Sequence, residues 1–182
     1  MAGKKRPPEL QLKLKMAKKK SLNGDKVQAI ILLKEALGLI HDYLEEIKKY
    51  SPKDLNEQEG KDKIKIQKYL TYVLDELANH TFELQRWNEA EHYFRLLLRD
   101  LLSSETPKED DSVVEVSLKL SISCAHQDKH DLALQGFQWT TDTIQKKIDE
   151  IPNASDNSKA LLGVCLEAWG TYLLSQDQPG MC

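Results

Sequence analysis

The segment LDELANHTFELQRWNEAEHYF, residues 74–94, contains two helical patterns separated by a short polar break. Apolar residues follow three- and four-residue spacings up to Phe82 and again from Trp87, and Gln85-Arg86 interrupts them. Ala78 and Ala90 are small residues at the points where two antiparallel helices would cross closely. The segment therefore predicts a helix-turn-helix hairpin, which needs similar neighbours to bury its apolar faces.

The same pattern recurs on both sides of this segment. Ala29, Ala90 and Ala133 mark the crossing in three copies, and a last half-copy contains Leu166, Trp169, Gly170 and Leu173. These features resemble the tetratricopeptide repeat family, whose unit is two antiparallel helices with small residues at the crossing. The resemblance implies an all-α fold, a right-handed solenoid of antiparallel helix pairs with about three and a half copies. A plain helical bundle is the alternative.

Composition limits the classes of function. Of the 182 residues, 40% are hydrophobic and 30% are charged, as in a globular chain with its own core. The net charge of -3 argues against nucleic acid as the main partner. The sequence has no apolar run long enough to span a membrane. Cys124, Cys165 and Cys182 have no paired spacing and are interpreted as small buried residues in a reducing compartment.

Domain organisation is expected to be simple. Residues 1–9 are predicted to form a disordered basic N-terminus, and residues 10–182 a tetratricopeptide-repeat helical domain truncated in its last repeat. The basic residues among the first twenty suggest either a targeting segment or a patch for anionic lipid. A solvated helix face is the favoured interpretation, because Leu10, Leu14 and Ala17 already have the spacing of a first helix.

Helices are expected over residues 27–49, from about residue 62 through the opening segment, over a third hairpin at 112–150, and over 158–175. The chain then ends where a partner helix would begin, which leaves Leu162, Leu166, Trp169 and Leu173 without cover. We therefore expect the chain to associate with itself through this incomplete repeat, or to fray after Pro152.

The sequence does not support a catalytic or metal-binding site. Cys124, His126 and His130 are close in sequence, but their spacing does not bring three ligands together on a helix. No nucleophile and base pattern and no Gly-rich phosphate loop is present. The sequence predicts a protein that is not an enzyme and that holds no cofactor and no metal.

Binding of another protein remains as the expected function. In an array of helix pairs the first helix of each pair lines a groove, which suits an extended or helical segment of a partner. For each residue taken singly, ordinary solvated surface is the alternative. The predicted partner-binding groove consists of Tyr72, Asp75, Glu76, Asn79, Leu118, Lys119, Ile122, Glu167 and Thr171.

Two subclasses of repeat protein were compared with this groove. Adaptors for chaperone tails hold a carboxylate with basic and amide side chains, but the equivalent positions here include Glu76 and Glu115, which would repel it. Repeats wider than the minimal unit also resemble kinesin light chain, a cargo adaptor.

Two further strings carry a closer resemblance. Residues 109–120, EDDSVVEVSLKL, and 161–168, LLGVCLEA, are similar to a mitochondrial family of tetratricopeptide repeat proteins. That family implies a non-enzymatic scaffold associated with the mitochondrial inner membrane, with subunits of respiratory complex III as partners. It also implies a role in the assembly or maintenance of complex III, including turnover of Rieske subunit fragments. The alternative is a cytoplasmic cargo or assembly adaptor that resembles kinesin light chain.

Overall fold

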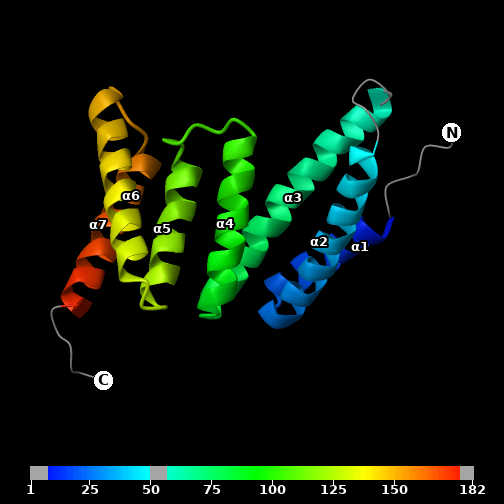
Figure 1. Ribbon diagram of the computed structural model, residues 1–182, viewed down its shortest axis with the longest axis horizontal. Helices are drawn as coiled ribbons and strands as arrows, with labels where there is room; N and C mark the ends of the chain where they lie inside the picture. Colours follow the sequence, from blue (N-terminus) through cyan, green and yellow to red (C-terminus); the bar gives the residue numbers. More distant parts are fainter. Residues whose placement is uncertain (1–7, 50–56, 177–182) are drawn as a thin grey trace. The chain divides into compact units, whose positions relative to one another are not determined.

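The computed structural model describes residues 8–49 and 57–176, which form seven α-helices and no strand (Figure 1). No helix in these two ranges is long and apolar enough to cross a membrane. The predicted disordered N-terminus lies outside the described residues except for Pro8 and Glu9, which begin the first helix. The helices are α1 (Pro8–Leu22), α2 (Lys26–Lys48), α3 (Glu57–Glu83), α4 (Trp87–Ser103), α5 (Asp111–Ala125), α6 (His130–Glu150) and α7 (Asp156–Gln176).

The helices occur where the sequence predicts them, with small differences at their ends. The third helix begins at Glu57, earlier than the expected start near residue 62, and the last extends over Asp156–Gln176. The shift at the last helix is one or two residues, as is usual for helix termini, whereas the start of the third helix differs by about five residues. The chain divides into two compact units, an N-terminal unit ending at Leu84 and a C-terminal unit beginning at Gln85.

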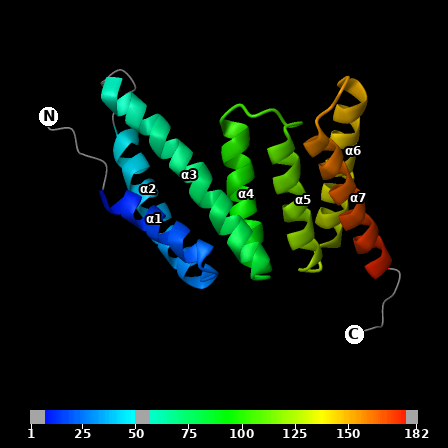
Figure 2. The same ribbon diagram turned by 180° about the vertical axis from the view of Figure 1, so that it is seen from behind.

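In the N-terminal unit, α2 packs against both α1 and α3 (Figure 2). Apolar residues at helical spacing on α2 face inward, so that Ala29, Leu33, Ala36 and Ile40 are at most 1% exposed. On the surface, Lys13 of α1 forms an ion pair with Glu35 of α2 at 2.6 Å. Such pairs contribute little, so burial of the apolar faces is what holds these helices together.

In the C-terminal unit, α5 packs against α4, α6 and α7. One hydrophobic cluster joins α5, α6 and α7, and it places both described cysteines inside the protein as expected. Its fully buried members are Val114, Leu118, Cys124, Ala133, Phe137, Ile144, Cys165 and Tyr172.

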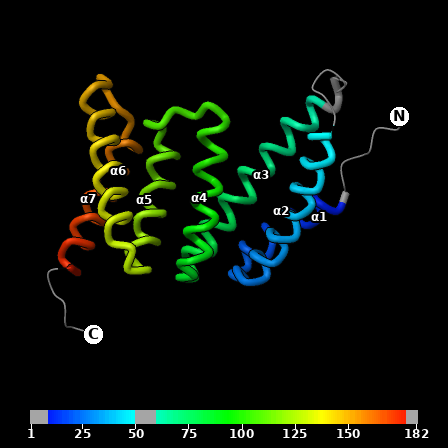
Figure 3. The backbone as a smooth tube through the Cα atoms, viewed as in Figure 1, coloured from blue at the N-terminus to red at the C-terminus, as the bar shows by residue number. Residues whose placement is uncertain are grey.

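Three short connections in the described chain join the helices of a pair (Figure 3), and the last two residues of each share one backbone conformation. The first residue has positive φ; the second has φ between -84° and -88° and ψ between 63° and 67°. Positive φ is strained for a residue with a side chain, which makes the recurrence at non-glycine positions informative. The turns are Gly24-Asp25, Gln85-Arg86 and Asp128-Lys129.

The three crossing alanines hold the same position after these turns. The backbone N–H of Ala29, Ala90 and Ala133 donates to the carbonyl of the second turn residue at 2.9–3.0 Å, and each alanine is 0% exposed. Four residues later each helix carries a large buried residue: Leu33, Phe94 and Phe137. The repeat register predicted from the sequence is thus present in the local structure of all three copies.

Close packing of α5 and α6 depends on small residues. Ser121 is 3% exposed and donates its hydroxyl hydrogen to the Ser117 carbonyl at 2.8 Å. Gly136 of α6 lies directly opposite, and a β-carbon placed on it would be 1.9 Å from Ser121 Oγ. Only a glycine permits this approach of the two helices.

Candidate functional site

Four of the predicted groove residues share one face of α3. Tyr72, Asp75, Glu76 and Asn79 are spaced as neighbours on a helix surface, and all four are half-buried. Asn79 Nδ2 donates to Asp75 Oδ1 at 2.9 Å and to the Asp75 carbonyl at 3.0 Å. These two hydrogen bonds fix the orientation of the Asn79 amide. The carboxylates of Asp75 and Glu76 are the principal charged groups of this face.

The α3 face has unusual electrostatics because it is acidic and partly dehydrated. Burial raises the pKa of Glu76; the nearby charges of Asp75 and Glu83 raise it further, while His80 and Lys18 oppose the shift. Burial also raises the pKa of Tyr72, and the charge of Glu76 adds to that effect. A negative charge is therefore held here at a cost in stability, as at many binding sites.

His80 lies beside this acidic face. It is 7% exposed, and neither ring nitrogen forms a hydrogen bond within the described residues. Glu76 Oε2 is 3.3 Å from His80 Nε2, and Glu83 Oε2 is 3.9 Å from His80 Nδ1. The imidazole therefore sits between two carboxylates.

The predicted groove residues of α5 and α7 differ in their exposure. Lys119 Nζ forms an ion pair with Glu115 Oε1 at 2.7 Å, and Ile122 is half-buried against the core cluster. Glu167 and Thr171 of α7 are exposed. Leu118 is different, because it is 2% exposed and belongs to the core. It has no surface to offer a partner, so Leu118 is removed from the predicted set of binding residues.

A polar network that the sequence did not suggest links α4 to the turn between α5 and α6. Glu91 is 8% exposed and accepts hydrogen bonds from Lys129 Nζ at 2.5 Å, Gln127 Nε2 at 2.8 Å and Arg95 Nη2 at 2.9 Å. Burial alone would raise the pKa of Glu91, but these donors outweigh it and hold the pKa below its usual value. The network fixes the position of the turn.

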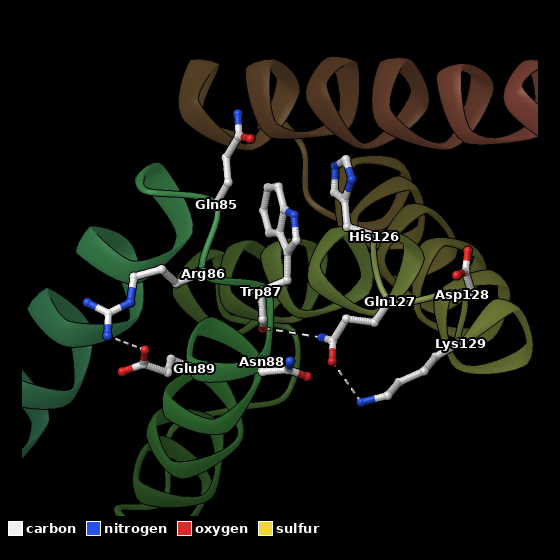
Figure 4. A pocket seen from close by; sticks show the side chains of 9 residues that line it. All are labelled: Gln85, Arg86, Trp87, Asn88, Glu89, His126, Gln127, Asp128 and Lys129. Carbon is white, nitrogen blue, oxygen red and sulfur yellow. Dashed lines mark hydrogen bonds and ion pairs between the residues drawn. The ribbon is translucent and has the colours of Figure 1, made fainter. Parts of the chain in front are cut away.

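An open hollow of about 610 Å³ lies above this network (Figure 4). The Trp87 and His126 rings stack at one side, with centroids 4.0 Å apart and planes within 4°. The Gln127 side chain points into the hollow and donates to the Trp87 carbonyl at 3.2 Å. The remaining lining residues are Gln85, Arg86, Asn88, Glu89, Asp128 and Lys129.

The described residues offer little for chemistry. No three His, Cys, Asp or Glu side chains in residues 8–49 and 57–176 are grouped so as to hold a metal ion. Burial raises the pKa of the Cys124 thiol and of the Cys165 thiol, which suppresses the reactive thiolate form.

Comparison with known proteins identifies relatives. No protein-family model matches the chain. The chain is 31% identical to human tetratricopeptide repeat protein 19, mitochondrial, over 121 residues, which cover 62% of this chain and 32% of that protein. The mouse protein of the same name is 33% identical over 119 residues, 61% of this chain and 33% of that protein. The Drosophila melanogaster homologue is 26% identical over 109 residues.

These matches confirm the resemblance found in the sequence. The chain spans about a third of the length of the curated relatives it matches. Among solved structures, a TPR-like protein from Chlorobium tepidum matches with a TM-score of 0.55 and 12% identity, covering 90% of this chain and 93% of that one. The fold is therefore that of an all-α helical repeat protein of the tetratricopeptide type, as predicted.

Proposed function

We propose that this chain is a non-enzymatic protein-binding scaffold that binds a segment of a partner through exposed residues on the first helices of its repeats. The observation that carries the proposal is the acidic α3 face. Glu76 keeps a carboxylate in a half-buried position that raises its pKa, with Tyr72 and Asp75 beside it. A surface that gives up stability to present charge favours a partner segment with basic side chains.

The partner proposed for this scaffold is mitochondrial respiratory complex III. The support is the similarity to relatives named tetratricopeptide repeat protein 19, mitochondrial, at 31–33% identity over about 60% of the chain. By that resemblance the chain supports assembly or maintenance of complex III, including turnover of Rieske subunit fragments. It is proposed to act in the mitochondrion, associated with the inner membrane, and to need no cofactor.

A cytoplasmic cargo or assembly adaptor that resembles kinesin light chain is the competing proposal. Both proposals use the same groove, since both require a helical repeat scaffold that binds a protein segment. The two differ in the compartment and in the protein that is bound. The experiment therefore determines the compartment of the chain first and the protein that it binds second.

The test uses the tagged chain in cultured animal cells. Fractionation with protease protection reports the compartment, and a native gel of solubilised mitochondria reports comigration with complex III. If the proposal is correct, the wild-type chain is protected from protease inside mitochondria and comigrates with complex III. A chain found in the cytosol would support the adaptor instead, and a mitochondrial chain that never comigrates with complex III would remove the complex III role.

A matched pair of variants tests the groove itself. Glu76→Lys reverses the half-buried charge and is expected to abolish comigration without changing location. Glu150→Lys makes the same change at an exposed site on α6, where Glu150 Oε1 is 3.7 Å from Lys146 Nζ, and should leave comigration intact. Equal behaviour of the two variants would show that the α3 face does not bind the partner.

A further inference from the structure

The carboxylate of Glu76 lacks the hydrogen-bond donors that comparable carboxylates of this chain possess. Asp111, whose side chain is 33% exposed, accepts hydrogen bonds from Lys147 Nζ at 2.7 Å and Ser158 Oγ at 2.8 Å. The Glu76 side chain is 28% exposed, and among the described residues it has no hydrogen-bond donor and no lysine or arginine as an ion-pair partner. A carboxylate that is partly dehydrated and has no donor gains most from a partner that supplies one.

His80 provides a second observation. Both of its ring nitrogens are buried, and neither forms a hydrogen bond within the described part of the chain, although Nε2 is only 3.3 Å from Glu76 Oε2. On the other side of the ring, Glu83 is paired with Lys26. The chain thus balances the charge of Glu83 but not that of Glu76. Buried polar atoms without partners are rare in folded proteins, so Glu76 and His80 together are suited to completion by a bound group.

Tyr72 completes the surroundings of this carboxylate. Tyr72, Glu76 and His80 follow one another at intervals of four residues, so they lie on successive turns of one face of α3. Tyr72 is half-buried, and burial together with the charge of Glu76 raises the pKa of its hydroxyl, which keeps the ring neutral. The face therefore presents an aromatic ring beside a carboxylate without donors.

We propose that Tyr72, Glu76 and His80 form a binding site for one arginine side chain of a partner protein. The guanidinium donates two parallel N–H groups to the Glu76 carboxylate, and its plane stacks on the Tyr72 ring. His80 is a positioning residue, because its buried nitrogens face the carboxylate and do not reach the arginine. The inference rests on the proposed function, since it requires a protein segment at the α3 face, and it names the side chain that is recognised.

Other cations fit this site less well. A lysine ammonium is a compact and strongly hydrated charge, which can neither donate two parallel bonds to one carboxylate nor stack its plane on a ring. A metal ion needs several ligands, and no three His, Cys, Asp or Glu side chains in the described ranges are grouped to hold one. Within the chain, Lys18 of α1 acts on Glu76 only through its charge and forms no ion pair with it among the described residues.

The test uses the whole isotope-labelled chain and two small probes, N-acetyl-arginine methylamide and N-acetyl-lysine methylamide, titrated separately and followed by NMR. We expect the arginine probe to shift the ring signals of Tyr72 and His80, and to bind at least about ten-fold more tightly than the lysine probe. Glu76→Gln should weaken binding of the arginine probe at least about ten-fold. Glu150→Gln, which removes an exposed carboxylate on α6, is the control and should leave it unchanged. A dispersed spectrum confirms that each variant is folded.

Two substitutions test the positioning role of His80. His80→Phe keeps an aromatic ring and removes both nitrogens, so it should lower the preference for the arginine probe over the lysine probe. A general loss of stability would weaken both probes alike and would leave this ratio unchanged. His80→Gln retains an N–H donor and should keep the preference. An unchanged ratio in folded His80→Phe would remove His80 from the site.

Three outcomes would overturn the arginine site: equal affinities for the two probes, no shift of the Tyr72 and His80 signals, or equal effects of Glu76→Gln and Glu150→Gln. Failure of the proposed function looks different. A chain that prefers the arginine probe but never comigrates with complex III keeps the arginine site and loses that partner. Comigration that Glu76→Lys abolishes, without any preference for the arginine probe, supports the proposed function and removes the arginine site.

Discussion

Ser121 of α5 lies against Gly136 of α6, with 1.9 Å separating Ser121 Oγ from the β-carbon that any other residue would place at position 136. The same hypothetical β-carbon would be 3.0 Å from the Ser121 β-carbon, so rotating the hydroxyl does not fully relieve the contact. The hydroxyl is also occupied by its bond to the Ser117 carbonyl. This pair sets how closely the two helices approach.

Gly136→Ala is therefore expected to destabilise the protein by about 1–3 kcal/mol, because overpacking outweighs the gain in helix propensity. Gly170→Ala is the matched control, since its β-carbon meets open space, and it should stabilise by roughly 0.5–1 kcal/mol. Urea denaturation of both variants measures the difference in free energy of unfolding. Equal stability of the two variants would contradict the packing described for Ser121.

Glu91→Gln is expected to lower the free energy of unfolding at pH 7 by about 1–3 kcal/mol, because Lys129 and Arg95 lose a buried carboxylate. The pKa of Glu91 is held below its ordinary value of 4.5 in the folded state. Its contribution is thus fully present above that value and is lost as the pH falls through the lower folded pKa. Denaturation from pH 7 to pH 3 should show the difference from wild type shrinking on the acid side.

An exposed ion pair provides the comparison for Glu91. Glu150→Gln removes a carboxylate that is 3.7 Å from Lys146 Nζ at the surface of α6. Its effect should stay within about 0.5 kcal/mol at every pH. A Glu91 effect as small as that, or one that grows at acid pH, would refute the role assigned to the network.

Glu76→Gln is expected to stabilise the protein at neutral pH by up to about 1 kcal/mol, because burial raises the pKa of Glu76 above its ordinary value of 4.5. The ionised carboxylate opposes folding, and this cost disappears once the pH falls below 4.5 and the group is protonated in both states. The gain should accompany weaker partner binding. A loss of stability at pH 7 would show that His80 and Lys18 outweigh burial.

Cys124 and Cys165 should resist thiol reagents in the folded protein. They are 2% and 0% exposed, and burial raises the pKa of both thiols. Their modification, followed by peptide mass spectrometry, should proceed only as fast as the protein opens and should accelerate in urea. Rapid modification of either cysteine in buffer would mean that the core of the C-terminal unit opens readily.

Sequence reasoning located the repeats because their signals are local. A small residue at a crossing and a polar break between apolar stripes can be recognised within one helix pair, and Ala90 and Ala133 lie fully buried where this logic placed them. The individual helix starts were less certain, as the early start at Glu57 shows. Helix ends fray and can be capped in more than one way, so the spacing of apolar residues does not locate them well.

The candidate site was less accessible to sequence reasoning. Leu118 and Lys119 are adjacent in the chain and the sequence predicts both as groove residues, but about 100° of rotation per residue places Leu118 in the core and leaves Lys119 half-buried. The Glu91 network joins residues that are far apart in sequence, Gln127 being 36 positions away. The sequence around Gln127 contains no pattern that would indicate a hydrogen bond to Glu91.

The three shared turns end in the same backbone conformation and join helices through only three or four residues, whereas the described connections between successive pairs are longer. Ser104–Asp110 joins α4 to α5, a shorter stretch joins α6 to α7, and the helices themselves range from 15 to 27 residues. The turn fixes where the two helices of a pair cross. Helices of different length therefore differ at the ends that lie away from the turn. Insertions are therefore expected to be tolerated poorly at the three turns and better between α4 and α5, where the exposed Pro107-Lys108 bond is the place to graft a fluorescent domain.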